Sequence, residues 1–74
     1  MKNKIYKTTK EIRDKFIKDG WSENIEFSIL TLDEAREKGY LFAIDEIQKG
    51  KTFFKMNGNG NIYYENGKLA CYNI

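Results

Sequence analysis

Two glycine-containing turns divide the last third of this 74-residue chain into three short segments. The stretches 57–60 and 66–67 contain Asn-Gly steps, which supply the positive φ angles that tight hairpin turns require. The segments beside them, 52–56, 61–65 and 69–73, are rich in aromatic and branched residues. This pattern predicts a three-stranded antiparallel β-meander.

Alternation along these segments suggests which side chains the rest of the molecule covers, without deciding which face of the sheet is buried. The candidates for the covered side are Phe54, Ile62, Tyr64, Leu69 and Cys71. The segment 60–69, an aromatic strand, an Asn-Gly turn and a second strand, resembles one unit of the MORN-variant repeat of some bacterial proteins. That family stacks several units and this chain has one, so the resemblance implies a hairpin and no functional residues.

A capping box begins the first predicted helix. Thr8 and Glu11 have the spacing at which each side chain bonds the backbone of the other residue. An apolar stripe with helical spacing follows, made of Ile12, Phe16 and Ile17. Gly20 lies where a left-handed residue ends a helix. The pattern predicts a helix over residues 8–19, with Trp21 folded back on its last turn.

The middle of the chain predicts a strand and then a helix. Residues 25–29 alternate between apolar and polar side chains, which is typical of a short half-buried strand. Thr31 begins a second capping box. We favour a helix from 31 to 49; in the rival interpretation the helix ends at Gly39 and Tyr40–Ile44 forms a strand.

Together these elements predict an α+β fold in one domain over residues 1–74. The expected order is helix, strand, helix and then the three-stranded meander, with the helices packed on one face of the sheet. Residues 1–7 would form a basic N-terminal arm, either flexible or an edge strand.

The residue types argue against an enzyme, a metal site and any cofactor. Cys71 is the only cysteine and histidine is absent, so the usual zinc ligands and the usual base for a cysteine nucleophile are missing. Cys71 lies in an apolar stretch, and we interpret it as a small hydrophobic residue in a cytoplasmic protein. No apolar run approaches the length of a membrane span, and the basic start lacks the apolar region of a signal peptide.

Charge is distributed unevenly along the chain. Residues 1–20 carry seven bases and three acids, residues 21–50 three bases and seven acids, and residues 51–74 three bases and one acid. Five tyrosines and one tryptophan are many for this length, and both types are favoured in protein interfaces. The acidic middle and these aromatics indicate a surface for another protein. The predicted partner-binding residues are Asp33, Glu34, Glu37, Tyr40, Tyr63 and Tyr64.

The leading hypothesis is therefore a small non-enzymatic protein-binding module that blocks its partner sterically or electrostatically. The bias towards Lys, Asn and Ile with no proline suggests a low-GC bacterium or its phage. An inhibitor or accessory protein of a phage or mobile element, of the anti-defence or anti-CRISPR kind, fits that setting, and a homo-oligomer is compatible with it. The partner itself is not indicated by any motif.

The alternative hypothesis is a nucleic-acid-binding regulator. It would use a basic arm to contact phosphates and lysines interleaved with aromatic residues in the hairpin to contact bases. The residues for this role are Lys2, Lys4, Lys7, Lys10, Lys55 and Lys68.

Overall fold

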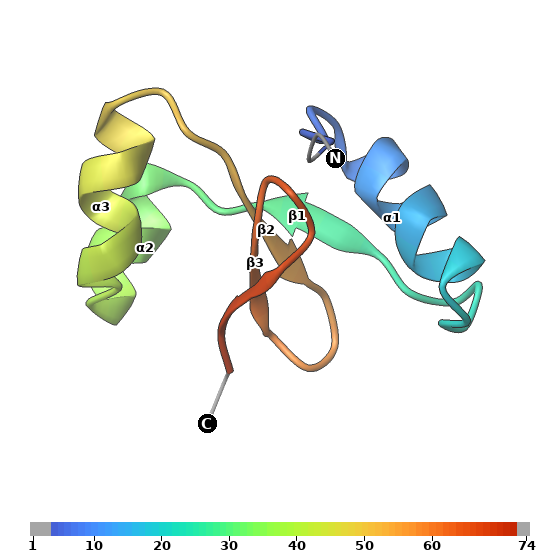
Figure 1. Cartoon of the computed structure of the whole chain (residues 1–74). Coiled ribbons are helices and arrows are strands. Elements are labelled where there is room, and N and C mark those ends of the chain that lie inside the picture. Colours follow the sequence, from blue (N-terminus) through green and yellow to red (C-terminus); the bar gives the residue numbers. More distant parts are fainter. Residues whose placement is uncertain (1–3, 73–74) are drawn as a thin grey trace.

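Three helices and four short strands follow one another in the computed structural model, which describes residues 4–72 (Figure 1). The elements are α1 (Thr9–Lys18), β1 (Phe27–Ile29), α2 (Leu32–Lys38), α3 (Leu41–Gln48), β2 (Phe53–Met56), β3 (Ile62–Tyr64) and β4 (Leu69–Cys71). The predicted α+β class and the meander are confirmed. β1 joins the meander to make a four-stranded antiparallel sheet in the order β1-β2-β3-β4.

The register of the sheet places alternate residues of β2 on opposite faces. Phe54 lies opposite Tyr63 of β3, whereas its neighbour Phe53 lies opposite Tyr64. Successive side chains of a strand point to opposite faces, so each of these pairs belongs to a different face. The pairing of β3 with β4 shifts between Ile62 and Tyr63, which is a local irregularity of the β-bulge type.

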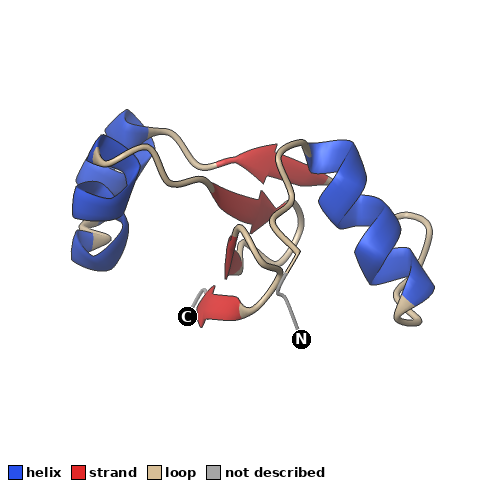
Figure 2. Ribbon diagram, turned by 45° about the horizontal axis from the view of Figure 1, so that its top comes forward, coloured by secondary structure: helices blue, strands red, loops and turns tan. Residues whose placement is uncertain are grey.

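The helices cover both faces of the sheet, so the prediction that they pack on one face is wrong. Figures 1 and 2 show α1 on one side of the sheet and the α2–α3 pair on the other. Phe54 is buried with residues of α1, whereas Phe53 is buried with residues of α2 and α3. Both faces of β2 are therefore apolar, which removes the alternation that would have identified one covered face.

The α1 side is an aromatic core. Its buried members are Tyr6, Ile12, Phe16, Phe27, Phe54, Met56 and Tyr63. The Phe16 ring meets Phe27 and Tyr63 edge-on, with centroids 5.0 and 4.9 Å away. Such edge-to-face pairs stabilise a core beyond the area they bury.

The α2–α3 side is a smaller core built on alanines. Its buried members are Leu30, Ala35, Ala43, Phe53 and Ile62. Ala35 of α2 and Ala43 of α3 are fully buried, and short side chains let the two helices lie close together. Among the predicted covered residues, Phe54 and Ile62 are buried, but on opposite faces, and Cys71 packs partly buried on the α2–α3 side. Tyr64 and Leu69 are exposed, which corrects that part of the prediction.

The first helix matches its sequence signals. The Thr8 hydroxyl accepts a bond from the Glu11 amide, and the Glu11 carboxylate accepts bonds from the amides of Lys7 and Thr8. These bonds, that from Lys7 above all, lower the pKa of Glu11 below its usual value. After Gly20, at φ 106°, the amide of Trp21 bonds the Phe16 carbonyl and the two rings meet, as predicted.

The predicted helix 31–49 is broken, and both interpretations of it need correction. Gly39, at φ 75°, ends α2 in a left-handed conformation that a continuous helix cannot accommodate. Tyr40 then caps a new helix rather than beginning a strand, so Leu41–Gln48 is helical. The two short helices pack together, and Ala35 and Ala43 are buried in the same apolar cluster.

The start of the described chain is attached to the sheet at one point. The Tyr6 amide donates to the Glu65 carbonyl at 2.8 Å, and the Tyr6 side chain is buried in the α1 core. Residues 4–7 form no strand. Of the predicted basic arm, residues 1–3 lie outside the described range, while Lys4 and Lys7 are exposed.

Candidate functional site

Four aromatic rings form a ladder that runs from α3 across the α2–α3 face of the sheet. Tyr40 contacts Phe42, Phe42 contacts Phe53, and Phe53 contacts Tyr64, with ring centroids 5.7, 5.7 and 5.3 Å apart. Phe53 in the centre is buried, but Phe42 and Tyr64 are 36% and 40% exposed. This aromatic ladder is therefore buried at Phe53 and reaches the surface on either side of it, at Phe42 and at Tyr64.

A groove of about 460 Å³ lies along the aromatic ladder, from Phe42 past Phe53 to Tyr64. Its apolar lining consists of Ile5, Phe42, Phe53 and Tyr64. They come from the start of the described chain, α3, β2 and β3, so distant parts of the sequence form one surface. A volume of this order accepts one or two side chains of a partner or a small organic molecule. We call it the α3 groove.

The polar lining of the α3 groove carries more negative than positive charge. It includes Glu46 of α3, Glu65 after β3 and Lys51 before β2. Lys51 Nζ lies 3.7 Å from a Glu65 oxygen, and the other Glu65 oxygen accepts a bond from the Thr52 amide. Glu46 has no ion-pair partner among residues 4–72.

Leu41 extends the apolar surface at the start of α3. Its side chain is 78% exposed, the largest exposed fraction among the large apolar residues of the described chain. It stands beside Phe42 in the first turn of the helix. Burying such a leucine on contact with another molecule is favourable by roughly 1.5–3 kcal/mol.

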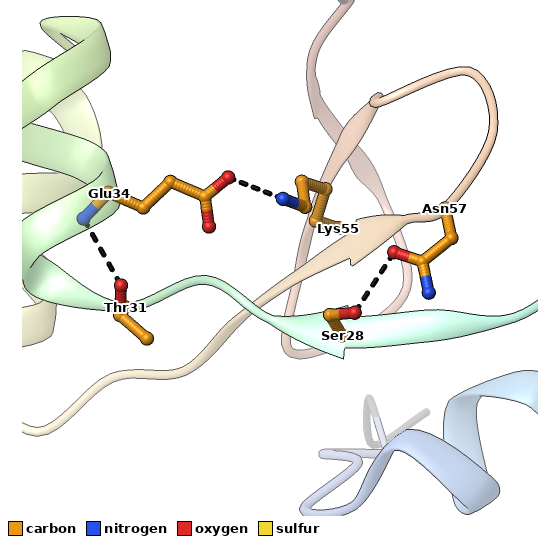
Figure 3. A network of polar contacts seen from close by, with 5 residues as sticks. All are labelled: Ser28, Thr31, Glu34, Lys55 and Asn57. Atoms are coloured by element: carbon orange, nitrogen blue, oxygen red, sulfur yellow. Dashed lines mark hydrogen bonds and ion pairs between the residues drawn. The ribbon is translucent and has the colours of Figure 1, made fainter.

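The predicted acidic surface is divided by an internal ion pair. Asp33 and Glu37 are exposed one turn apart on α2. Glu34 instead points at the sheet, where its carboxylate pairs with the ammonium of Lys55 in β2 (Figure 3). The Thr31 hydroxyl caps the Glu34 amide, but Glu34 does not return the bond, so only half of the predicted capping box forms.

The three predicted tyrosines lie on different faces of the sheet. Tyr40 and Tyr64 belong to the aromatic ladder. Tyr63, only 6% exposed, packs in the α1 core on the opposite face, which leaves it little surface for a partner. The structure therefore brings Tyr40 and Tyr64 to the side of the molecule that also carries Asp33 and Glu37.

The predicted nucleic-acid residues do not form one free basic face. Lys55 is paired with Glu34, and Lys4 lies over the Tyr6 ring at 5.3 Å. Lys7, Lys10 and Lys68 are exposed, and Lys2 lies outside the described residues. Helices cover both faces of the sheet, so its central aromatics are not available as a platform for stacked bases.

Sequence reasoning did not select four residues of this surface: Ile5, Leu41, Phe42 and Glu46. One signal for them existed, because Leu41 falls on the outward side of any helix that starts near Thr31. The groove itself could not be read from the pattern, since it depends on the break at Gly39 and on the position of residue 5.

Other kinds of site have little support in the described part of the chain. Within residues 4–72, no group of three metal-ligating side chains could hold an ion. Cys71 is a free thiol, partly buried, whose Sγ lies 3.3 Å from the Tyr72 carbonyl oxygen. None of the helices in this range has both the length and the apolar composition to cross a bilayer.

In comparisons with known proteins, no family model, curated protein or solved structure matches the chain. The ten residues that resemble a MORN-variant unit contain β3, the Asn-Gly turn and the first residue of β4, which pair as a hairpin with a shifted register. The α3 groove and the surface around it are therefore the features of the described chain that bear on its function.

Proposed function

We propose that this protein is a small non-enzymatic module that binds another protein through its α2–α3 side. The contact surface consists of the α3 groove, Leu41 and the exposed acids of α2. An inhibitory role, in which the bound module blocks its partner, fits the size of the chain and remains part of the proposal.

The observation that carries this proposal is the exposure of large apolar side chains in one place. Leu41, Phe42, Tyr64 and Ile5 are all at least one-third exposed, and three of them line the same groove. Contiguous apolar surface rimmed by charge marks sites of protein contact. Glu46, Lys51 and Glu65 line the same groove and supply such charged groups.

The nucleic-acid alternative has weaker support. Its hairpin lysine Lys55 is neutralised by Glu34, and the aromatic residues Phe53 and Tyr63 are buried under helices. The α2–α3 pair has the outline of two helices joined by a short turn, but the residues Leu41–Gln48 of α3 include no base. Such a helix would repel the phosphates of a DNA groove.

Immobilised protein and a nuclease-treated bacterial extract test the proposal directly. A stoichiometric protein should be retained after nuclease treatment and identified by mass spectrometry. Leu41→Ser should weaken its retention because it removes exposed apolar surface without disturbing the core. The paired reversal Asp33→Lys and Glu37→Lys should weaken retention of a basic partner and make it less sensitive to salt.

The matched control is Ile29→Ser. Ile29 is also a large exposed apolar residue, at 48%, but it lies on the sheet face that α1 covers. Its substitution should leave retention unchanged. Recovery of nucleic acid alone, lost after nuclease and at high salt, would support the regulator instead.

A further inference from the structure

Glu46 is placed where any partner that closes over the α3 groove must cover it. It projects from α3 one turn after Phe42, and both side chains line the groove. The other carboxylate, Glu65, already has Lys51 and the Thr52 amide as partners. A neutral partner lying over the groove would therefore take Glu46 out of water without compensation, which is costly.

We propose that the α3 groove accepts a protein segment that presents an apolar side chain next to a lysine or arginine. The apolar side chain lies against Ile5, Phe42 and Tyr64, and the cation pairs with Glu46. An arginine suits a carboxylate best because it donates two parallel hydrogen bonds. This inference rests on the proposed protein-binding function and specifies the chemistry of the partner.

The charges around the groove favour the same partner. Asp45, beside Glu46, is exposed and adds a second negative charge on α3. Residues 31–50 carry five acids and three bases. One of these acids, Glu34, forms an ion pair with Lys55 of β2, so its charge is neutralised by the sheet. A segment with an acid beside its apolar side chain would meet like charge at the groove.

A second copy of this chain is a poor occupant for the same reason. In a two-fold dimer built on the α3 groove, the same patch meets itself. Glu46 of each copy would then approach Glu46 of the other across a desolvated interface. Like charges brought together in this way oppose association.

Selection from a random heptapeptide library, displayed on phage against the whole immobilised chain, tests the inference. The wild-type protein should enrich peptides in which an apolar residue stands next to lysine or arginine. Glu46→Lys should enrich peptides with an acid in that place. Glu46→Gln, which keeps the shape of the side chain, should enrich apolar peptides without a charge preference.

Affinities of the best wild-type peptide provide the quantitative measure. Glu46→Lys should lower its affinity about tenfold or more, because attraction becomes repulsion inside the groove. Asp14→Lys is the matched control: Asp14 is an exposed acid of α1, so the substitution makes the same change of charge on a helix outside the groove lining and outside the proposed contact surface. It should change the affinity less than about twofold, since exposed charges are screened by salt.

The outcomes separate this inference from the proposed function. Enriched peptides without a base, or equal binding by wild type and Glu46→Lys, would overturn it. The inference would also be overturned if sedimentation showed that the wild-type protein is a dimer and that Tyr64→Ser converts it to a monomer. If the extract yields a protein partner while no peptide is enriched, the groove chemistry is wrong and the protein-binding function stands; if neither experiment yields a partner, both fail.

Discussion

The two sides of the sheet use different side chains to hold their helices. On the α1 side, Phe16 packs against three aromatic rings, and one long helix is capped at both ends. On the α2–α3 side, the buried helix residues are the alanines Ala35 and Ala43, and α3 has no side-chain cap at its start. The large aromatic residues of the α1 core are buried, whereas Phe42 and Tyr64 on the α2–α3 side remain partly exposed to solvent. The contrast shows how one small sheet can have one side whose aromatic core rings are buried and another side with partly exposed rings.

The strongest test of this contrast compares Phe16→Ala with Phe42→Ala. Phe16 is buried, so its loss should lower the free energy of unfolding by about 3–5 kcal/mol. Phe42 is already partly hydrated, and its loss should cost about 1–2 kcal/mol. Urea unfolding followed by circular dichroism measures both. Equal losses would mean that the α2–α3 side contributes as much stability as the α1 side.

The next test concerns the ion pair that joins α2 to the sheet. Both side chains of Glu34–Lys55 are about three-quarters shielded from solvent. A double-mutant cycle with Glu34→Gln and Lys55→Met should give a coupling of about 1–2 kcal/mol, between the usual values for exposed and buried pairs.

The α1 side contains a suitable reference for that cycle. Lys15 and Asp19 form an exposed pair one turn apart, with 2.7 Å between Nζ and the carboxylate. Their coupling should be about 0.3–0.5 kcal/mol and should fall further in salt. If the two couplings are equal, Glu34–Lys55 does not fasten α2 to the sheet in the way we infer.

Gly39→Ala measures the cost of the break between α2 and α3. No atom lies near the position that the added methyl group would occupy, so the cost of about 1 kcal/mol would come from the left-handed backbone alone. Gly20→Ala, after α1, should cost a similar amount for the same reason. Thermal unfolding measures the loss of stability in each of the two variants. A much larger loss for Gly39→Ala than for Gly20→Ala would show that packing of the α2–α3 core depends on the angle between the two helices.

The smallest expected change in stability is at the two helix caps, and it should depend on pH at Glu11 but not at Thr31. The pKa of Glu11 is lowered in the folded state, so its stabilisation is complete above the ordinary glutamate pKa and is lost as the pH falls through the lowered value. Glu11→Gln should therefore destabilise the protein at pH 7 and have little effect in strong acid. Thr31→Ala should destabilise the protein equally at pH 7 and in strong acid, because the Glu34 carboxylate makes no bond to the backbone of Thr31. Unfolding free energies measured across the acid range test this difference.

Elements defined by neighbouring residues could be predicted from the sequence. The box at Thr8 and Glu11, the fold-back of Trp21 and the Asn-Gly turns all depend on contacts within a few residues. The two-sided sheet could not be predicted as easily, although Phe53-Phe54 carried a signal. Two consecutive buried aromatics are typical of a strand covered on both faces.

The candidate site was predicted only in part, because it depends on distant residues. Tyr64, Asp33 and Glu37 lie on the proposed side, but the pairing of Glu34 with Lys55 joined residues from two competing hypotheses. No local pattern shows that a carboxylate on a helix will reach a lysine 21 positions away. The groove likewise needs the turn at Gly39 before its lining residues come together.

The α1 core has a consequence for the order in which the protein folds. Ile12 and Phe16 are made early, but the strand residues that bury them, Phe54 and Tyr63, follow some forty residues later. The bond from the Tyr6 amide to the Glu65 carbonyl spans nearly the whole described chain. Contacts this distant in sequence slow folding and delay it during synthesis. The first helix can meet Trp21 and Phe27 soon after it is made, but its apolar stripe is fully covered only after β2 and β3 have been made.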